Sequence, residues 1–256
     1  MSDLGLAARQ VRYTNRAFWR NPANAFFTFV FPLMFLVIFT ALFGNDTTRV
    51  LGQEIKTSTF YVAAIAVFSI ITATYTNLAI SVSFQRDSGV LKRVRGSPLP
   101  AWAYMFGRIV HAILVAALLV IIVAVFGAAF YHAKLPSHTL PAYVVTLIVG
   151  AASFSALGLA LTAVIPNADA APAVVNATIL PLLFLSDIFI PLNSETAWYV
   201  KVAKVFPVYH FSHAMQKAYF TPTGSGWSGG HLLIMGAWGV AGVILASLFF
   251  SWEPRR

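Results

Sequence analysis

The chain has 256 residues, of which 59% are hydrophobic and only 10% are charged, and its mean hydropathy is +0.77. A soluble domain carries about 25% charged residues, so the composition excludes a water-soluble globular protein and indicates an integral membrane protein. The net charge of +9 comes from bases that flank apolar segments, not from a separate basic domain. This distribution favours membrane topology over nucleic-acid binding as its explanation.

Residues 1–22 predict an amphipathic helix that lies on the membrane surface. At 100° per residue, four arginines fall on one stripe and apolar side chains lie opposite, so the cations would face anionic lipid head groups. These arginines are Arg9, Arg12, Arg16 and Arg20. Asn21 and Pro22 are expected to end the helix. Its role is left open between a membrane anchor and a contact with a partner protein.

Six apolar segments are each close to the ~20 residues that a helix needs to cross the bilayer core. They cover residues 24–43, 60–83, 109–131, 142–165, 172–192 and 231–251. Spans one to five therefore lie within residues 24–192, and span six within residues 231–251. Residues 193–230 contain a stretch too polar to span, which predicts a re-entrant segment at the outer surface. The expected fold is all-α, with residues 1–256 forming a single transmembrane domain.

The distribution of bases predicts the orientation. The N-terminal tail, the loop at 84–108 and the C-terminus carry 11 of the 17 lysines and arginines. By the positive-inside rule, both termini and this loop should lie in the cytoplasm. An even number of spans agrees with that arrangement, and the expected location is the cytoplasmic membrane of a bacterium.

The basic loop between the second and third spans predicts a short amphipathic helix at residues 88–95. Ser88 is the expected N-cap, Val90, Leu91 and Val94 share one face, and Gly96 begins the stop signal. Two interpretations are possible: a loop that only sets membrane topology, or a helix that docks onto a partner.

The sequence from Phe84 to Val110, FQRDSGVLKRVRGSPLPAWAYMFGRIV, resembles the cytoplasmic loop of ABC-2-type transporter permeases. The positions that carry the resemblance are Ser97, Pro98, Leu99, Trp102, Tyr104, Gly107 and Arg108. Asn21-Pro22 and the stretches 185–191 and 206–210 are also similar to family segments. Asp87-Ser88 replaces a common acidic pair, and Val90 replaces a common threonine.

The resemblance implies two permease subunits working with two ATP-binding subunits that grip the loop helix and the N-terminal helix. The sequence itself has no G-x-x-x-x-G-K-[ST] phosphate loop and no extramembrane segment of the ~50 residues that a domain needs. ATP and Mg²⁺ would therefore bind to a separate ATPase chain, and this chain is not expected to be an enzyme. The predicted contacts with the ATPase are Arg86, Asp87, Val90, Leu91, Arg93 and Val94.

Polar residues within the spans suggest a translocation path, with helix–helix hydrogen bonding as the alternative. They are Thr72, Thr76, Asn77, Asn176 and Asp187. Asp187 is an acidic residue inside an apolar segment, and acidic residues within membrane spans are candidates for a functional role. Capping, or pairing with Lys201 or Lys204, is the first interpretation of it, and substrate contact the second. His210 and His213 form an HxxH pair without a nearby acid, so no metal site is predicted.

The expected function is export of a hydrophobic or amphipathic small molecule, with export of a polysaccharide or lipid-linked glycan as the alternative. An ion-coupled secondary transporter is a further alternative. It would need membrane-buried ionisable groups and usually inverted repeats. Only Asp187 is available, and no repeat is visible. An intramembrane enzyme would need a converging set of His, Asp or Glu, which the spans lack.

Overall fold

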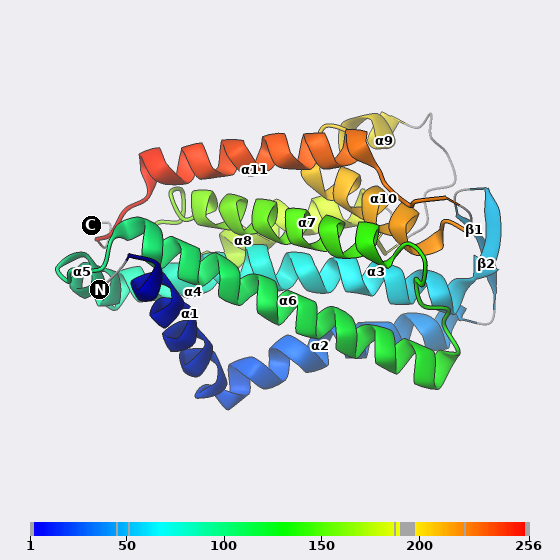
Figure 1. The fold of residues 1–256 in the computed structure, drawn as a ribbon, viewed down its shortest axis with the longest axis horizontal. Coiled ribbons are helices and arrows are strands. Elements are labelled where there is room, and N and C mark those ends of the chain that lie inside the picture. Colours follow the sequence, from blue (N-terminus) through cyan, green and yellow to red (C-terminus); the bar gives the residue numbers. More distant parts are fainter. Residues whose placement is uncertain are drawn as a thin grey trace.

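A computed structural model describes residues 3–44, 46–50, 52–186, 188–189, 198–222 and 224–253. The elements are α1 (Asp3–Trp19), α2 (Pro22–Phe43), β1 (Thr47–Val50), β2 (Gln53–Lys56), α3 (Thr57–Ile71), η1 (Thr72–Thr76), α4 (Asn77–Asp87), α5 (Val90–Arg95), α6 (Ala101–Tyr131), α7 (Leu140–Leu161), α8 (Ala171–Phe184), α9 (Trp198–Ala203), α10 (Pro207–Phe220) and α11 (Gly229–Phe249). The long helices form an elongated bundle. Both chain ends and α5 lie at one end, and the two strands and α9 lie at the other (Figure 1).

Five helical segments are long and apolar enough to cross a membrane: α2, the continuous helix 57–87, α6, α7 and α11. They match the predicted first, second, third, fourth and sixth spans. The predicted fifth span at 172–192 corresponds to α8, which has only 14 residues and contains Pro181. At 1.5 Å per residue it is ~21 Å long, short of the ~30 Å hydrocarbon core. The helical membrane fold is therefore confirmed, and the count of six spans stays a prediction.

The predicted break after the N-terminal helix is confirmed at the corner between α1 and α2. The Asn21 side chain accepts a 3.2 Å hydrogen bond from the backbone N–H of Asn24, and Pro22 occupies the first turn of α2. Such an N-cap and N1 proline are typical helix-start features. Ala7 and Thr14 are buried where α1 packs along α6, whereas the four arginines of the predicted stripe are exposed.

The centre of the bundle is α3, in which every residue is buried. It packs against α2, α6, α7 and α10, which explains why its sequence is apolar on all sides. The helix continues into a π-helical turn, η1, against which α7 packs closely. A Cβ atom added to Gly158 of α7 would lie 2.9 Å from the Tyr75 carbonyl oxygen. The glycine therefore permits a backbone approach that a larger residue would block.

Small residues also bring α7 and α11 together. Ser153 donates a 2.9 Å hydrogen bond to the carbonyl oxygen of Met235. A Cβ on Gly239 would lie 2.7 Å from Ser153 Oγ, and Ala156 is buried in the same face of α7. Small residues of this kind let membrane helices approach closely.

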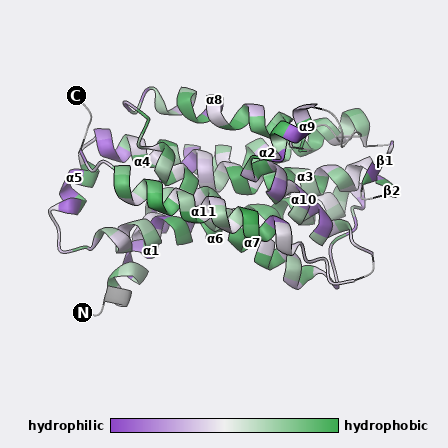
Figure 2. Cartoon of the chain, turned by 90° about the horizontal axis from the view of Figure 1, so that it is seen from above, coloured by the Kyte–Doolittle hydropathy of each residue, from purple (hydrophilic) through white to green (hydrophobic). Residues whose placement is uncertain are grey.

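Two features at the opposite end of the bundle were not predicted. The strands β1 and β2 form an antiparallel hairpin with Thr47 paired to Lys56, so the fold is not wholly helical. The helix α10, expected to be an amphipathic segment at the outer surface, has 12 buried residues of 14 and packs against α3, α7, α8 and α11. Its re-entrant placement stays a prediction. Hydrophilic residues gather at both ends of the bundle (Figure 2).

Candidate functional site

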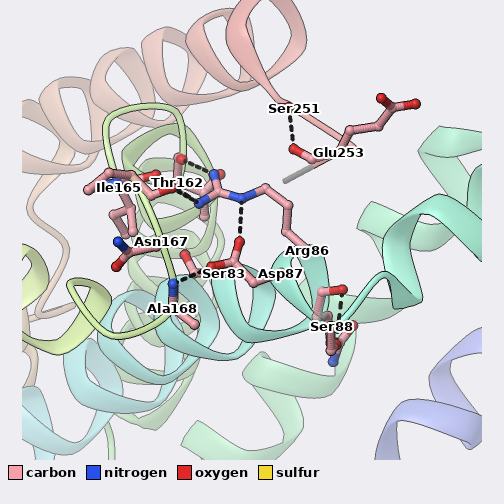
Figure 3. A network of polar contacts seen from close by, with 12 residues as sticks. Ser83, Arg86, Asp87, Ser88, Thr162, Ile165, Asn167, Ala168, Ser251 and Glu253 are labelled. Carbon is pink, nitrogen blue, oxygen red and sulfur yellow. Dashed lines mark hydrogen bonds and ion pairs between the residues drawn. The ribbon is translucent and has the colours of Figure 1, made fainter. Parts of the chain in front are cut away.

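The end of α4 is fixed to the turn that follows α7 by the side chain of Arg86. This residue is 1% exposed, although it lies next to a loop. Its Nη1 donates a 3.0 Å hydrogen bond to the Thr162 carbonyl oxygen, and its Nη2 donates to those of Ile165 and Pro166 at 2.8 and 3.3 Å (Figure 3). The planar guanidinium suits this task because it offers several donors in a fixed fork.

Asp87 completes this junction. Its Oδ1 lies 3.3 Å from Arg86 Nε, and its Oδ2 accepts a hydrogen bond from the backbone N–H of Ala168. The buried arginine is thus paired with a carboxylate and with carbonyl oxygens, which compensates the cost of removing its charge from water. We refer to Arg86, Asp87 and the turn 162–168 as the clamp. Within this turn, Asn167 Oδ1 accepts a 2.9 Å hydrogen bond from the N–H of Ala170.

The predicted loop helix exists, but it begins at Val90, two residues later than expected. Gly89 precedes it with φ +73°, a left-handed conformation that glycine adopts without strain. Ser88 is not the N-cap, because its hydroxyl donates instead to the Gln85 carbonyl oxygen at 3.3 Å. Gly96 ends the helix as predicted.

The predicted apolar face of α5 is turned mainly toward this chain. Leu91 has 0% exposure and packs into a cluster, and Val94 is half-buried at the edge of that cluster. The other buried members of the cluster are Leu78, Val82, Tyr104, Leu159 and Ala246. The expectation that Val90, Leu91 and Val94 together face a partner is therefore wrong for Leu91, because the amphipathic helix covers the end of its own bundle.

The six predicted coupling residues thus occupy two environments. Arg86 and Leu91 are buried within the chain, and Asp87 and Val94 are partly buried. Val90, 38% exposed, and Arg93 lie on the outer side. Lys92 and Arg95 are exposed beside them, so the outer surface of α5 is basic with one apolar side chain.

Four of the five predicted translocation residues lie on η1, α4 and α8. Asn77 lies 3.5 Å from the Thr28 hydroxyl of α2, and Thr72 and Thr76 are half-buried in η1. Asn176 is exposed on α8. Asp187 lies outside the described residues, so its predicted role stays a prediction.

The histidines of α10 are engaged in contacts within the chain. His210 Nδ1 lies 2.8 Å from His231 Nδ1, and its Nε2 lies 2.8 Å from the Lys204 carbonyl oxygen. His213 stacks on Tyr209 with 3.9 Å between ring centroids. Within the described part of the chain, no group of three or more His, Cys, Asp or Glu residues is placed to hold a metal ion.

Residues 9–220 match the ABC-2 type transporter family, and the chain belongs to that family. The match includes α5, the clamp and most of the bundle. Membership makes the chain a membrane-embedded transport subunit that works with an ABC ATP-binding protein.

Curated relatives carry permease names. The chain is 24% identical to the putative transport permease ycf38 of Porphyra purpurea over 235 residues, which is 91% of this chain and 79% of the relative. It is 25% identical to the protein of the same name from Cyanophora paradoxa, covering 81% and 71% of the two chains. It is 24% identical to the probable multidrug ABC transporter permease YbhR of Escherichia coli K12 over 141 residues, 55% and 38% of the two chains.

Proposed function

We propose that this chain is the permease subunit of an ATP-driven exporter that moves a hydrophobic or amphipathic small molecule out of the cell. Two copies would associate with two ATP-binding subunits at the bundle end that carries α5, which would face the cytoplasm. The observation that carries the proposal is the combination of an exposed basic surface on α5 with the clamp behind it. A movement of α5 would be passed on to the rest of the bundle.

The outer surface of α5 suits a contact with a soluble protein. Lys92, Arg93 and Arg95 offer charge for attraction and orientation, while Val90 offers apolar area at the centre. Exposed charges steer association and fix register more than they add affinity. The apolar side chain would supply most of the binding energy of this small surface. Arg95 also lies 3.7 Å from Glu253, so the C-terminal segment borders the same surface.

The substrate class rests on similarity and on composition. The relative YbhR is named a probable multidrug permease. The first predicted span, α2, is crowded with phenylalanines, and Phe26, Phe27 and Phe31 are exposed on it. A long carbohydrate would need an aromatic-lined path, and these exposed rings are as well suited to contact with lipid as to such a path.

The test is assembly and activity of the complex with its ATPase. Tagged permease is purified from membranes, and the ABC ATP-binding protein that co-purifies with it is identified. ATP hydrolysis and ATP-dependent accumulation of ethidium in inside-out vesicles are then measured. Arg93→Glu should reduce both assembly and accumulation. Arg49→Glu is the matched control, because Arg49 is exposed on the hairpin at the opposite end.

If Arg93→Glu and Arg49→Glu reduced assembly and dye accumulation equally, the effect would be due to net charge, and the proposed contact between α5 and the ATPase would be contradicted. Dye accumulation that continues without the ATPase but collapses when the proton gradient is abolished would replace the proposal with an ion-coupled transporter.

A further inference from the structure

A cavity of about 520 Å³ lies among α1, α2, η1, α4 and α6. Its volume falls within the range of small-molecule sites. It is separate from the outer surface of α5 and from the clamp, and its lining includes the corner between α1 and α2. On α6 it reaches Arg108, seven residues after the first residue of the helix. At 1.5 Å per residue this is ~10 Å along the helix axis.

The inner wall of the cavity carries a buried cation that is incompletely paired. Arg108 is 7% exposed, and its Nη2 donates to the Ser81 hydroxyl. Its Nε is buried and has no hydrogen-bond partner among the described residues. None of the residues lining the cavity is Asp or Glu. A buried charge without a counter-ion is costly, so an oxygen of an anionic ligand would complete this environment.

A second polar atom on the same wall also lacks a partner. His111 lies one turn beyond Arg108 and is 8% exposed, and its Nδ1 has no hydrogen-bond partner among the described residues. The ring of Phe18 covers it at a centroid distance of 5.4 Å. Arg108 and His111, from consecutive turns of α6, thus both line the cavity, and each has a buried nitrogen without a hydrogen-bond partner among the described residues.

Arg86 provides an internal comparison. It is also buried, but its guanidinium reaches three carbonyl oxygens and Asp87. Among the described residues, Arg108 has only the Ser81 hydroxyl as a hydrogen-bond partner. An anion in the cavity would therefore stabilise Arg108 in a way that Arg86 does not need.

Neutral donors surround the charged wall. The side chains of Asn21, Asn24, Asn77 and Gln85 line the cavity. Asn21 uses its side-chain oxygen to cap α2, which leaves its NH₂ group to donate. Amide and guanidinium donors together match the several acceptor oxygens of a phosphate or carboxylate.

Part of the exposed lining of the cavity is apolar. Ala17 and Phe84 are exposed lining residues, with Phe84 50% exposed, and Asn21 and Asn24 are exposed lining residues too. Next to the corner, Trp19 and Phe26 are 50% and 58% exposed. A soluble anion would gain nothing from these side chains, whereas an acyl chain would cover them. Exposed aromatic residues of this kind are typical of the membrane interface.

We infer that this cavity binds the anionic head group of a membrane amphiphile, with Arg108 and His111 contacting a phosphate or carboxylate and the hydrocarbon chain leaving past Phe84. This binding would be a property of the permease alone and would not depend on the ATPase.

The test uses the full chain, purified in detergent and freed of lipid, in native mass spectrometry. Dioleoyl phosphatidylglycerol is titrated against dioleoyl phosphatidylcholine, which has the same acyl chains but brings a cation with its phosphate. We expect preferential binding of phosphatidylglycerol. Arg108→Gln should weaken it by about tenfold or more, because a hydrogen bond to a charged group is lost. Arg16→Gln is the matched control, since Arg16 is exposed on α1 outside the cavity.

A second pair of variants leaves Arg108 in place. Ala17→Trp should fill the opening and weaken binding of phosphatidylglycerol, whereas Ala8→Trp, on an exposed position of the same helix away from the cavity, should not. If Arg108→Gln does not fold, this pair of variants still tests whether the lipid binds in the cavity. Wild-type binding in Ala17→Trp would overturn the assignment to this cavity. Displacement of the lipid by an equal concentration of soluble glycerol 3-phosphate would overturn the assignment to a membrane amphiphile.

Discussion

Arg86 donates a 3.0 Å hydrogen bond to the carbonyl oxygen of Thr162, a residue 76 positions later in the chain. The contact joins the last turn of α4 to the residue that follows α7, and Asp87 strengthens it through Ala168. Helix ends leave carbonyl groups without intrahelical partners. At the end of α7, the backbone N–H groups of residues 162–164 satisfy the carbonyls of residues 159–161, and the buried Arg86 side chain satisfies that of Thr162. This fixes the end of α4, directly before α5.

The clamp predicts a large stability effect from a single residue. Arg86→Met should remove the guanidinium donors, so that three carbonyl oxygens lose their hydrogen bonds from this side chain and Asp87 loses its ion pair. We expect the free energy of unfolding to fall by about 3 kcal/mol. The measurement is thermal unfolding of the detergent-purified permease. Arg93→Met, on the exposed side of α5, should unfold at the wild-type temperature. Identical melting of the two variants would show that the clamp does not stabilise the fold.

Leu91 and Val90 are neighbours with opposite environments, and they separate folding from assembly. Leu91→Ala should destabilise the isolated permease by about 2–5 kcal/mol, because it empties a fully buried site. Val90→Ala should leave the melting temperature unchanged, because the side chain is on the outer surface of α5. In the presence of the ATPase, Val90→Ala should reduce co-purification. If Val90→Ala alone lowered the melting temperature, the described orientation of α5 would be wrong.

The contact between α7 and α10 depends on a glycine. A Cβ atom on Gly150 would collide with the ring of Phe211, which has 0% exposure. Gly150→Ala should therefore overpack this contact and cost about 1–3 kcal/mol. Gly236→Ala is the control, since its Cβ would meet nothing within 4 Å on α11. Melting in the same detergent should show a decrease for the first variant only.

Hydrophobic segment length and the helix start at Asn21 and Pro22 could be predicted from the sequence, whereas the N-cap of α5 could not. The corner at Asn21 and Pro22 was predictable because an N-cap and an N1 proline act within one turn of the chain. The five long apolar helices were predictable because the bilayer sets their length. The length of α8 was not predictable in this way, because the helix ends at Phe184 while the apolar segment of the sequence continues beyond it.

Features that depend on distant contacts could not be predicted. The orientation of Leu91 is decided by Tyr104 and Ala246, which the periodicity of α5 does not contain. An amphipathic pattern shows that one face is buried, but not whether the chain itself or a partner buries it. Arg108 appeared in the sequence only as part of a family-like Gly-Arg pair, and its burial required the packing of α1 across α6.

The π-helical turn changes which side chains of the second predicted span share a face. A π-helical turn contains more residues than an α-helical turn, so it shifts the faces of α4 relative to those of α3. A count at 3.6 residues per turn that begins in α3 therefore assigns the residues of α4 to the wrong faces. Ser83 is fully buried and bonds the Ala79 carbonyl oxygen, whereas Ser81 and Gln85 line the cavity.

The topology can be tested directly because the chain has no cysteine. Ser97→Cys follows α5 and Glu54→Cys lies in β2, and both positions are exposed. A membrane-impermeant maleimide should label Glu54→Cys in intact cells and Ser97→Cys only in inside-out vesicles, because these positions lie at opposite ends of the bundle. Labelling of both from the same side would contradict a transmembrane orientation of the bundle.

The clamp gives α5 a particular mechanical character. Along the chain, α5 is joined to α4 only through Ser88 and Gly89, and this short link by itself would leave α5 free to move relative to α4. Since Arg86 and Asp87 also hold the turn between α7 and α8, a load applied to α5 is divided among three helices at their common end. α5 itself is held by Leu91, so it cannot bend at Gly89 without pulling this buried side chain out of its cluster. The rigidity of the junction between α4, α7 and α8, more than the affinity of a partner for α5, then limits how far a displacement of α5 is transmitted into the membrane-spanning helices.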